Sequence, residues 1–201
     1  MSTKSITLSC HCARTTHTIS IPTTSLPLPA HLCSCDISRR ISGSLLTSYI
    51  NITFSPSDSK PNTSTCTPYH SSSKLTRWFC KTCGTHMYLE YHADGHFEAA
   101  TGTLRVGEGG GEESPESTDG IIEFKSVMWI EATKDGGAAA FLPTINNTPL
   151  PHYLREAYQS PEIPIDWTAP NPSPSTSPPA HPKPPEPTTP KPIPAHCHCH
   201  G

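Results

Sequence analysis

The stretch that decides the fold is 77–85, Arg-Trp-Phe-Cys-Lys-Thr-Cys-Gly-Thr, in which two residues separate Cys80 from Cys83. Two thiolates at this spacing can come from one turn and supply half of a tetrahedral zinc site. Gly84 follows directly, and glycine takes the left-handed conformation that often ends such a turn without strain. The stretch therefore predicts a metal-binding turn. The alternative, Cys80 as a small buried apolar side chain, leaves its regular partner Cys83 unexplained.

The other cysteines repeat this pairing. Eight of the nine fall into close pairs: Cys10/Cys12, Cys33/Cys35, Cys80/Cys83 and Cys197/Cys199. Residues two apart in a strand lie on the same face, so Cys10 and Cys12 can present both sulfurs together. An ordinary strand is the alternative for this pair. Together with Cys80 and Cys83 it completes a four-thiolate zinc site.

The third pair opens the run 33–40, Cys-Ser-Cys-Asp-Ile-Ser-Arg-Arg. Two thiolates leave coordination positions open on a metal unless Ser38, His31, Asp36 or water joins them. An open position is what catalytic zinc requires, so Cys33 and Cys35 are candidate metal ligands and catalytic residues. A structural loop without a catalytic role is the alternative.

Composition limits the classes of function. The chain has 201 residues, 15% of them charged, and a net charge of -3, so nucleic-acid binding through a basic surplus is disfavoured. No apolar run reaches the length of a membrane span, and Met1–Cys10 lacks the pattern of a signal peptide. We therefore expect a cytoplasmic protein, in which cysteines more often bind metals or react than form disulfides.

Residue patterns divide the chain at about 158. Short β-branched and aromatic runs over 4–158 predict a mainly β domain. The expected strands are Ser5–Cys10, Thr15–Ile21, Ser48–Phe54, Met87–Tyr91, Phe97–Thr103 and Val127–Glu131, with a short helix at Pro151–Tyr158 and loops at 55–73 and 107–120. Cys66 lies alone in the first loop and is interpreted as an exposed thiol without a role.

The C-terminal part differs in composition. More than half of the 24 prolines lie after residue 160, and we interpret 159–194 as a disordered Pro-rich linker. The Cys-His-Cys run of residues 10–12 recurs at 197–199, so 195–201 is interpreted as the possible start of a truncated second module.

The order of these motifs resembles a known family. Cys10-x-Cys12, then Cys33-x-Cys35-x-x-Ser38, then Arg77-x-Phe79-Cys80-x-x-Cys83-Gly84-Thr85 resembles the glutathione-dependent formaldehyde-activating enzymes, a family that also includes the centromere protein V domain. Ser72, Ser73, Gly102-Thr103-Leu104, Trp129 and Tyr153 add to the likeness, which covers about 4–158.

The resemblance implies a β-tent of small antiparallel sheets, clamped by a structural zinc on Cys10, Cys12, Cys80 and Cys83. It also implies a second zinc on Cys33, Cys35 and a third cysteine, but position 38 is Ser here. A serine hydroxyl is a poor zinc ligand at neutral pH, so metal at this site should be weaker or absent.

Two functions are expected from the resemblance. The first is a carbon-sulfur lyase that forms or cleaves an adduct between a thiol such as glutathione and an aldehyde such as formaldehyde, with zinc as Lewis acid. Arg39, Arg40 and Arg77 are candidate anchors for substrate carboxylates, or else ordinary surface charges. The second is a non-catalytic zinc module whose second metal site has decayed at Ser38 and which binds a protein or a small thiol. A chromatin role ranks last, because the chain lacks a basic arm.

Overall fold

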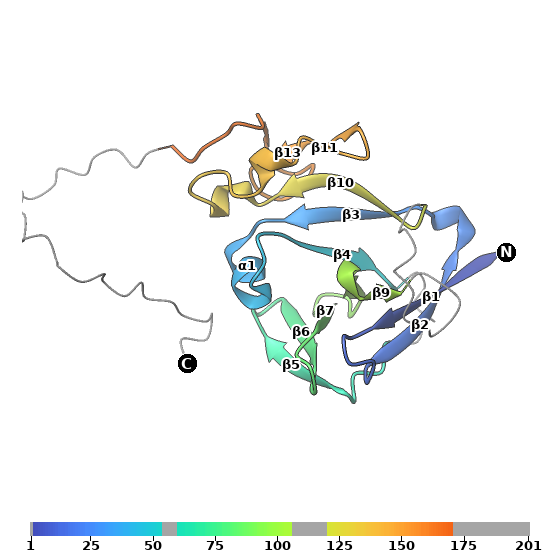
Figure 1. Cartoon of the computed structure of the whole chain (residues 1–201). Coiled ribbons are helices and arrows are strands. Elements are labelled where there is room, and N and C mark those ends of the chain that lie inside the picture. Colours follow the sequence, from blue (N-terminus) through green and yellow to red (C-terminus); the bar gives the residue numbers. More distant parts are fainter. Residues whose placement is uncertain (1, 54–59, 106–119, 171–201) are drawn as a thin grey trace, which may run out of the picture.

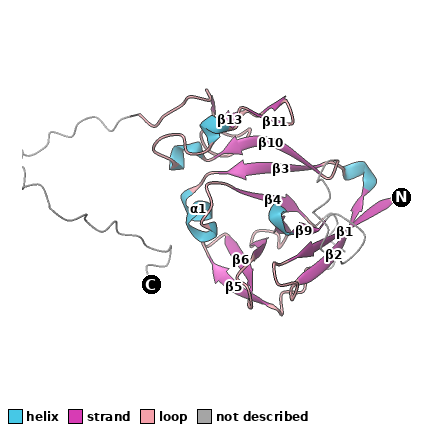
Figure 2. Cartoon of the chain, viewed as in Figure 1, coloured by secondary structure: helices cyan, strands magenta, loops and turns pink. Residues whose placement is uncertain are grey.

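A computed structural model describes residues 2–53, 60–105 and 120–170, and this part of the chain is mainly β with a single α-helix (Figures 1 and 2). The strands form a nine-stranded sheet in the order β14-β13-β10-β3-β4-β8-β7-β6-β5, a three-stranded sheet β2-β1-β9 and a two-stranded sheet β11-β12. The mainly β class expected from the sequence is thus confirmed. In these residues, no helix has the length and apolar character needed to cross a bilayer.

The elements have the following bounds. The strands are β1 (Thr3–Ser9), β2 (Thr16–Pro22), β3 (Leu28–Cys33), β4 (Thr47–Asn51), β5 (Cys66–His70), β6 (Leu75–Cys80), β7 (His86–Tyr91), β8 (Phe97–Ala100), β9 (Leu104–Arg105), β10 (Ile122–Met128), β11 (Thr144–Ile145), β12 (Thr148–Pro149), β13 (His152–Tyr153) and β14 (Glu162–Ile163). The helices are α1 (Asp36–Ser42) and the short 3-10 turns η1 (Thr23–Ser25), η2 (Thr101–Thr103), η3 (Ile130–Ala132) and η4 (Ala139–Phe141).

The core lies between the three-stranded sheet and the nine-stranded sheet. Strands β1 and β2 form an antiparallel hairpin in which Ile6 and Leu8 alternate with polar residues that face outward. This period of two is what buries one face of a strand. Both side chains join one buried cluster with Ile50 of β4 and Met87 of β7, so the same core holds both sheets together.

The nine-stranded sheet departs from the expected antiparallel arrangement. Strand β10 runs parallel to β3 and to β13, whereas the other pairs of this sheet are antiparallel. The chain segment that links β3 to β10 contains strands β4 to β9, and so long a connection permits a parallel pair. Figure 1 shows the sheet curling from β10 and β3 to β6 and β5, with β1 and β2 beside its far end.

Most expected strands exist with shifted ends. Five of them coincide with β1, β2, β4, β7 and β8. The sixth, expected at Val127–Glu131, lies earlier in the chain, because β10 begins at Ile122 and ends at Met128. Trp129 follows with a φ of 61°, a left-handed conformation that ends the strand and leads into η3. The expected loop 55–73 is wrong over Cys66–His70, which form β5 and pair with β6. Most of the expected loop 107–120 lies outside the described residues.

The helix α1 was not expected, although its ends carry signals. Asp36 lies in the first turn and Arg39 in the last, which complements the helix dipole. Gly43 caps the C-terminus with a φ of 68°. The helix is only seven residues long, too short for an apolar periodicity to stand out. It buries one side chain, that of Ser38.

The expected helix at 151–158 is also wrong. Residues 152–153 form β13 instead, because the Val127 N–H donates to the Pro151 carbonyl at 3.0 Å and draws the segment onto β10. Strand β14 pairs with β13 within the range 159–194 expected to be a linker, so the sheet continues to Ile163. The remainder of that range beyond 170, and the possible second module at 195–201, lie outside the described residues.

Candidate functional site

Four cysteines meet where two hairpins approach each other. Cys10 and Cys12 belong to the turn between β1 and β2, while Cys80 and Cys83 belong to the end of β6 and the turn before β7. Their four sulfurs all lie within 4.8 Å of one another. The Cys10 and Cys12 sulfurs are 3.5 Å apart, and those of Cys12 and Cys80 are 3.8 Å apart. The structure thus brings together the four residues that the sequence paired, in a group that could hold a metal ion.

The two turns are closed by hydrogen bonds of different span but end in the same left-handed conformation. The Ala13 N–H donates to the Cys10 carbonyl at 3.0 Å, and the Gly84 N–H donates to the Cys80 carbonyl at 2.9 Å. The residue after each second cysteine is left-handed, with a φ of 72° at Gly84 as expected and of 58° at Ala13. Alanine pays a steric penalty there that glycine does not.

Hydrogen bonds surround the sulfurs of the cluster and favour an ionised sulfur at Cys83. The Thr15 N–H donates to Cys10 Sγ at 3.2 Å, and Thr85 Oγ1 lies 3.2 Å from Cys83 Sγ. Hydrogen bonds from the Thr85 hydroxyl and backbone lower the pKa of Cys83 to about 5. Thr85 also accepts from the His11 N–H at 3.2 Å, which ties the β1–β2 turn to the β6–β7 turn.

Cys66 does not match its interpretation as an exposed thiol. It is 3% exposed, because β5 pairs with β6 and places Cys66 directly opposite Cys80. Its sulfur lies 4.0 Å from Thr15 Oγ1. Cys66 is therefore a buried neighbour of the four-cysteine cluster and not one of its four members.

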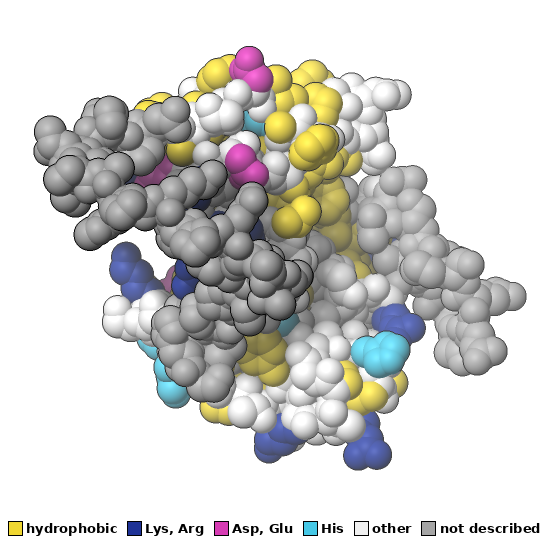
Figure 3. All heavy atoms as spheres, turned by 60° about the vertical axis from the view of Figure 1, so that its left-hand side comes forward, with side chains coloured by type: hydrophobic (Ala, Val, Ile, Leu, Met, Phe, Trp, Pro, Cys, Tyr) yellow, Lys and Arg dark blue, Asp and Glu magenta, His cyan; other side chains and the backbone are white. Residues whose placement is uncertain are grey.

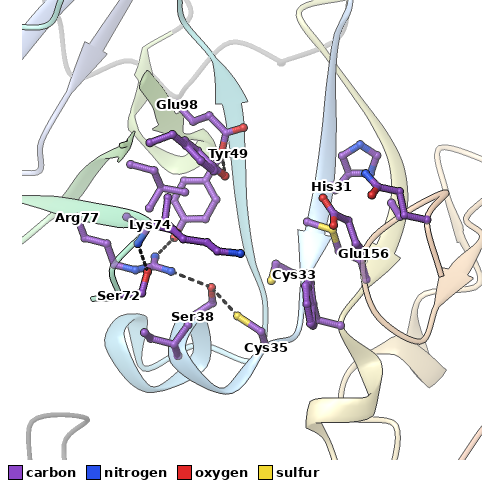
Figure 4. A pocket seen from close by; sticks show the side chains of 18 residues that line it. His31, Cys33, Cys35, Ser38, Tyr49, Ser72, Lys74, Arg77, Glu98 and Glu156 are labelled. Carbon is purple, nitrogen blue, oxygen red and sulfur yellow. Dashed lines mark hydrogen bonds between the residues drawn. The ribbon is translucent and has the colours of Figure 1, made fainter. Parts of the chain in front are cut away.

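A pocket of about 690 Å³ lies elsewhere, between α1, the ends of β3 and β10, and strands β4 and β6 to β8 (Figure 4). Its wall is formed by His31, Cys33, Cys35, Ile37, Ser38, Tyr49, Ser72, Lys74, Leu75, Arg77, Leu89, Tyr91, Glu98, Met128, Trp129, Glu156, Ala157 and Gln159. On the face drawn in Figure 3, the described Lys and Arg side chains are scattered among polar and hydrophobic ones.

The second cysteine pair lies in the wall of this pocket. Cys33 ends β3 and is 7% exposed, and Cys35 caps the N-terminus of α1. Cys35 Sγ is hydrogen-bonded to Ser38 Oγ at 3.1 Å. Hydrogen bonds from the Cys33 thiol and Ser38 lower the pKa of Cys35 to about 5, whereas the same bond and burial raise the pKa of Cys33. The structure thus places Cys33, Cys35 and Ser38 together.

Only one of the three candidate arginines faces the pocket. Arg77 is 2% exposed and donates from Nη2 to Ser38 Oγ at 3.4 Å, from Nη1 to Tyr49 Oη at 3.1 Å and from Nε to Ser71 Oγ at 3.3 Å. Arg39 instead donates to the Ser34 and Ala132 carbonyls, which fixes α1 to the loop after β10. Arg40 is exposed and lies outside the pocket wall.

Arg77 carries a buried charge with no acidic partner among the described residues. The ion pairs of this part of the chain involve Arg39, His96, Lys125 and Arg155. A buried guanidinium is costly unless an anion compensates it. The pocket therefore has a site for negative charge, either on a ligand or on a neighbouring thiolate.

Tyr49 accepts a hydrogen bond from Arg77 and is itself hydrogen-bonded to His86. His86 Nε2 lies 3.2 Å from the Tyr88 carbonyl, which can only accept, so Nδ1 accepts from the Tyr49 hydroxyl at 3.2 Å. Burial and the charge of Arg77 lower the pKa of His86 to about 3, so the ring is neutral. The Tyr49 proton is thereby directed to His86, and its oxygen accepts from Arg77.

Sequence reasoning missed several of these residues. Tyr49 lies in an expected strand, but nothing in the local pattern separates it from other strand residues that face the core. His86 reaches Tyr49 only because the sheet brings together β7 and β4, which are far apart in the sequence, whereas Ser71 lies in the turn just before β6, six residues from Arg77. Glu98, a pocket residue whose pKa is raised by burial, is likewise placed by β8.

The donors around Cys33 and Cys35 do not complete a second zinc site. Ser38 Oγ already accepts from the Arg77 guanidinium, so a fixed cation stands beside the third position. Asp36 pairs with Arg39, and His31 Nδ1 is bonded to Ser126 Oγ at 2.7 Å. Within the described ranges, the four-cysteine cluster is the one group in which three or more metal-binding side chains converge.

Comparison with known proteins agrees with the motif order. The family model described as glutathione-dependent formaldehyde-activating enzyme matches residues 5–114, a shorter range than the 4–158 expected. A solved structure of a Rhodobacter sphaeroides protein is 17% identical, with a TM-score of 0.37, over 59% of this chain and 99% of that chain. No curated protein is significantly similar. Because the family match spans more than half of the chain and includes both halves of the four-cysteine cluster, this protein belongs to the glutathione-dependent formaldehyde-activating enzyme family.

Proposed function

We propose that the chain forms or cleaves an adduct between a small thiol, such as glutathione, and an aldehyde, such as formaldehyde, in the pocket beside Cys33 and Cys35. The observation that carries this proposal is the buried Arg77, which has no acidic partner among the described residues and lines the same pocket as the Cys33 and Cys35 thiols. Family membership supplies the substrate class.

Zinc fits the four-cysteine cluster. A tetrahedron with zinc–sulfur distances of about 2.3 Å has sulfur–sulfur edges of about 3.8 Å, close to the Cys12–Cys80 separation of 3.8 Å. Cys10, Cys12, Cys80 and Cys83 would hold the ion and leave no open position. Zinc in such a site contributes folding free energy and no reaction step.

Zinc does not fit the pair Cys33 and Cys35, for the reasons given above, so the reaction relies on the side chains of the pocket. Adduct formation joins the thiol sulfur to the carbonyl carbon, and negative charge develops on the aldehyde oxygen before it takes a proton. A guanidinium held in place stabilises such charge where water is excluded. Arg77 is held by Tyr49, Ser71 and Ser38 and supplies this cation.

A second function is a zinc-stabilised module that binds a small thiol or a protein without turnover. The observation that favours it is Ser38, which stands where a third metal ligand is expected and is engaged by Arg77. The same pocket would then bind an anionic thiol against Arg77.

Exchange NMR of a glutathione and formaldehyde mixture tests the proposal. The full chain should accelerate adduct exchange above the spontaneous rate, and Arg77→Gln should reduce the excess rate at least about tenfold, because it removes a charge-assisted contact. Arg40→Gln is the matched control, since Arg40 is exposed and outside the pocket. Binding of glutathione without any acceleration would favour the non-catalytic module.

A further inference from the structure

The wall of the pocket contains a carboxyl group that the proposed function leaves unused, that of Glu98. Glu98 of β8 and Arg77 of β6 both pair with Leu89 of β7, one from either side of that strand. Residues directly opposite each other in neighbouring strands project to the same face of a sheet. Arg77, Leu89 and Glu98 therefore share one face, and all three line the pocket (Figure 4).

The spacing of the strands sets the separation of the two charged groups. Neighbouring strands lie about 4.8 Å apart, so the Cα atoms of Arg77 and Glu98, two strands apart, are separated by about 10 Å. The ion pairs of the described residues include neither of these side chains. A cation and a carboxyl group thus stand on either side of Leu89, with room between them for the thiol and the carbonyl group of a small adduct.

A hydrogen bond from Tyr91 fixes the Glu98 carboxyl group. The Tyr91 hydroxyl donates to Glu98 Oε2 at 3.2 Å, from the position diagonal to Glu98, two residues beyond Leu89 on β7. The Tyr91 ring is itself stacked on His96, with the ring centroids 4.2 Å apart. One carboxyl oxygen is thus engaged, while Oε1 has no hydrogen-bond partner within the described part of the chain.

The surroundings of Glu98 favour proton exchange. Burial raises the pKa of Glu98 above its ordinary value, and the hydrogen bond from Tyr91 opposes that rise. The titratable groups that face it are Tyr91 from β7 and Tyr49 from β4, with His96 two residues earlier in the chain. A carboxyl group whose pKa lies closer to neutral pH is a better acid and base catalyst than an ordinary surface carboxyl group.

Other groups of the pocket are less suited to moving a proton. Arg77 keeps its protons at every working pH. The Tyr49 proton is directed to His86. Glu156 is exposed, whereas Glu98 is a partly buried carboxyl group of the pocket wall.

We propose that Glu98 is the acid–base residue of the adduct reaction, which makes its role depend on the proposed function. In the forward direction, the Glu98 carboxylate takes the proton of the thiol, and the sulfur electron pair forms the carbon–sulfur bond. The π electron pair of the carbonyl group moves to its oxygen, whose charge Arg77 stabilises, and the Glu98 carboxylic acid returns the proton to that oxygen. Cleavage follows the same steps in reverse. The carboxylate is regenerated, and no atom is oxidised or reduced by the enzyme.

Exchange NMR of glutathione and formaldehyde with Glu98→Gln tests this role. The excess exchange rate at saturating glutathione should fall at least about 100-fold, because an amide cannot carry the proton. The glutathione concentration that gives half of the maximal rate should change less than about threefold. Glu90→Gln is the matched control and should keep the parent rate, because Glu90 lies on β7 outside the pocket wall and accepts from Trp78 Nε1 at 3.0 Å. Thermal unfolding checks that both variants are folded.

The pH profile of the same assay gives a readout that a merely structural role would not move. In the parent, the excess rate should fall on the acid side as Glu98 becomes protonated. Tyr91→Phe removes the hydrogen bond that favours the carboxylate, so the pKa of Glu98 rises and this acid limb should move to higher pH. An acid limb that stays in place in Tyr91→Phe would contradict the proposal.

The outcomes distinguish the role of Glu98 from the proposed function. If Arg77→Gln loses the acceleration and Glu98→Gln keeps it, the adduct reaction stands and Glu98 is not its acid–base residue. A Glu98→Gln protein that needs more glutathione but reaches the parent rate at saturation would show that Glu98 only binds substrate, which also overturns the proposal. A parent chain without any acceleration would overturn both the adduct reaction and the role of Glu98.

Discussion

Arg77 Nη2 lies 3.4 Å from Ser38 Oγ, so the residue at the expected third-ligand position is bound to a buried cation. This contact changes what Cys33 and Cys35 can do. A divalent ion beside them would lie close to the Arg77 charge, and like charges repel strongly where water is excluded. The same guanidinium favours a thiolate on Cys35 and negative charge on a bound ligand.

Loss of one cluster cysteine should destabilise the whole fold. Cys83→Ser removes one of four ligands from the cluster that joins the β1–β2 turn to the β6–β7 turn, and should lower the free energy of unfolding by about 3 kcal/mol or more. Urea unfolding with and without a chelator checks this. Cys66→Ala is the matched control, because Cys66 is buried beside the cluster but should leave chelator sensitivity intact. A Cys83→Ser protein as stable as the parent would contradict a role for zinc in stabilising the fold.

Replacing the left-handed alanine after Cys12 by glycine should stabilise the folded protein. Ala13→Gly relieves the steric cost of a φ of 58° and should raise the free energy of unfolding by about 0.5 to 1 kcal/mol. The reciprocal change Gly84→Ala should lower it by about 1 kcal/mol, because Gly84 has a φ of 72° in the equivalent turn. Thermal unfolding of both zinc-loaded variants measures the effect. A decrease in stability for Ala13→Gly, or no decrease for Gly84→Ala, would contradict this prediction.

The neutral His86 should make stability depend on pH. Its folded pKa is lowered to about 3, so between the unfolded value of about 6.5 and pH 3 only the unfolded chain takes up this proton. Stability is complete above pH 6.5 and falls as the pH decreases. As the pH falls from 7 to 5.5, this histidine should lower the free energy of unfolding by about 1 kcal/mol.

His86→Asn isolates that contribution. Its amide oxygen can accept the hydrogen bond from Tyr49, but it has no titratable group. Unfolding in urea at saturating zinc should show a shallower decline with falling pH for this variant than for the parent. Equal slopes would mean that His86 is not held neutral.

The sequence predicted the four-cysteine cluster because its information is local. Cys80/Cys83 has turn spacing, and Gly84 marks the end of that turn. Cys10/Cys12 has the close spacing of a ligand pair, although it lies in the turn after β1 and not in a strand as expected. The hairpin strands could also be predicted, since Ile6 and Leu8 alternate with polar residues. Cys66 could not be placed, because its burial depends on the pairing of β5 with β6.

The pocket was only partly predictable. Cys33, Cys35 and Arg77 carry motif signals, but Tyr49 and His86 meet Arg77 through strands far apart in the sequence. That no acidic side chain of the described residues pairs with Arg77 is a property of packing that no local pattern records. The short helix α1 was missed because its seven residues show end signals and little periodicity.

Zinc stoichiometry by native mass spectrometry tests the central claim, that the cluster is a metal site and the pocket pair is not. The full chain is used with Cys197→Ser and Cys199→Ser, so that the terminal thiols add no ligands. We expect one zinc per chain, and two in the Ser38→Cys variant, which restores a third thiolate. Two zincs before that change, falling to one in Cys35→Ser, would contradict the account.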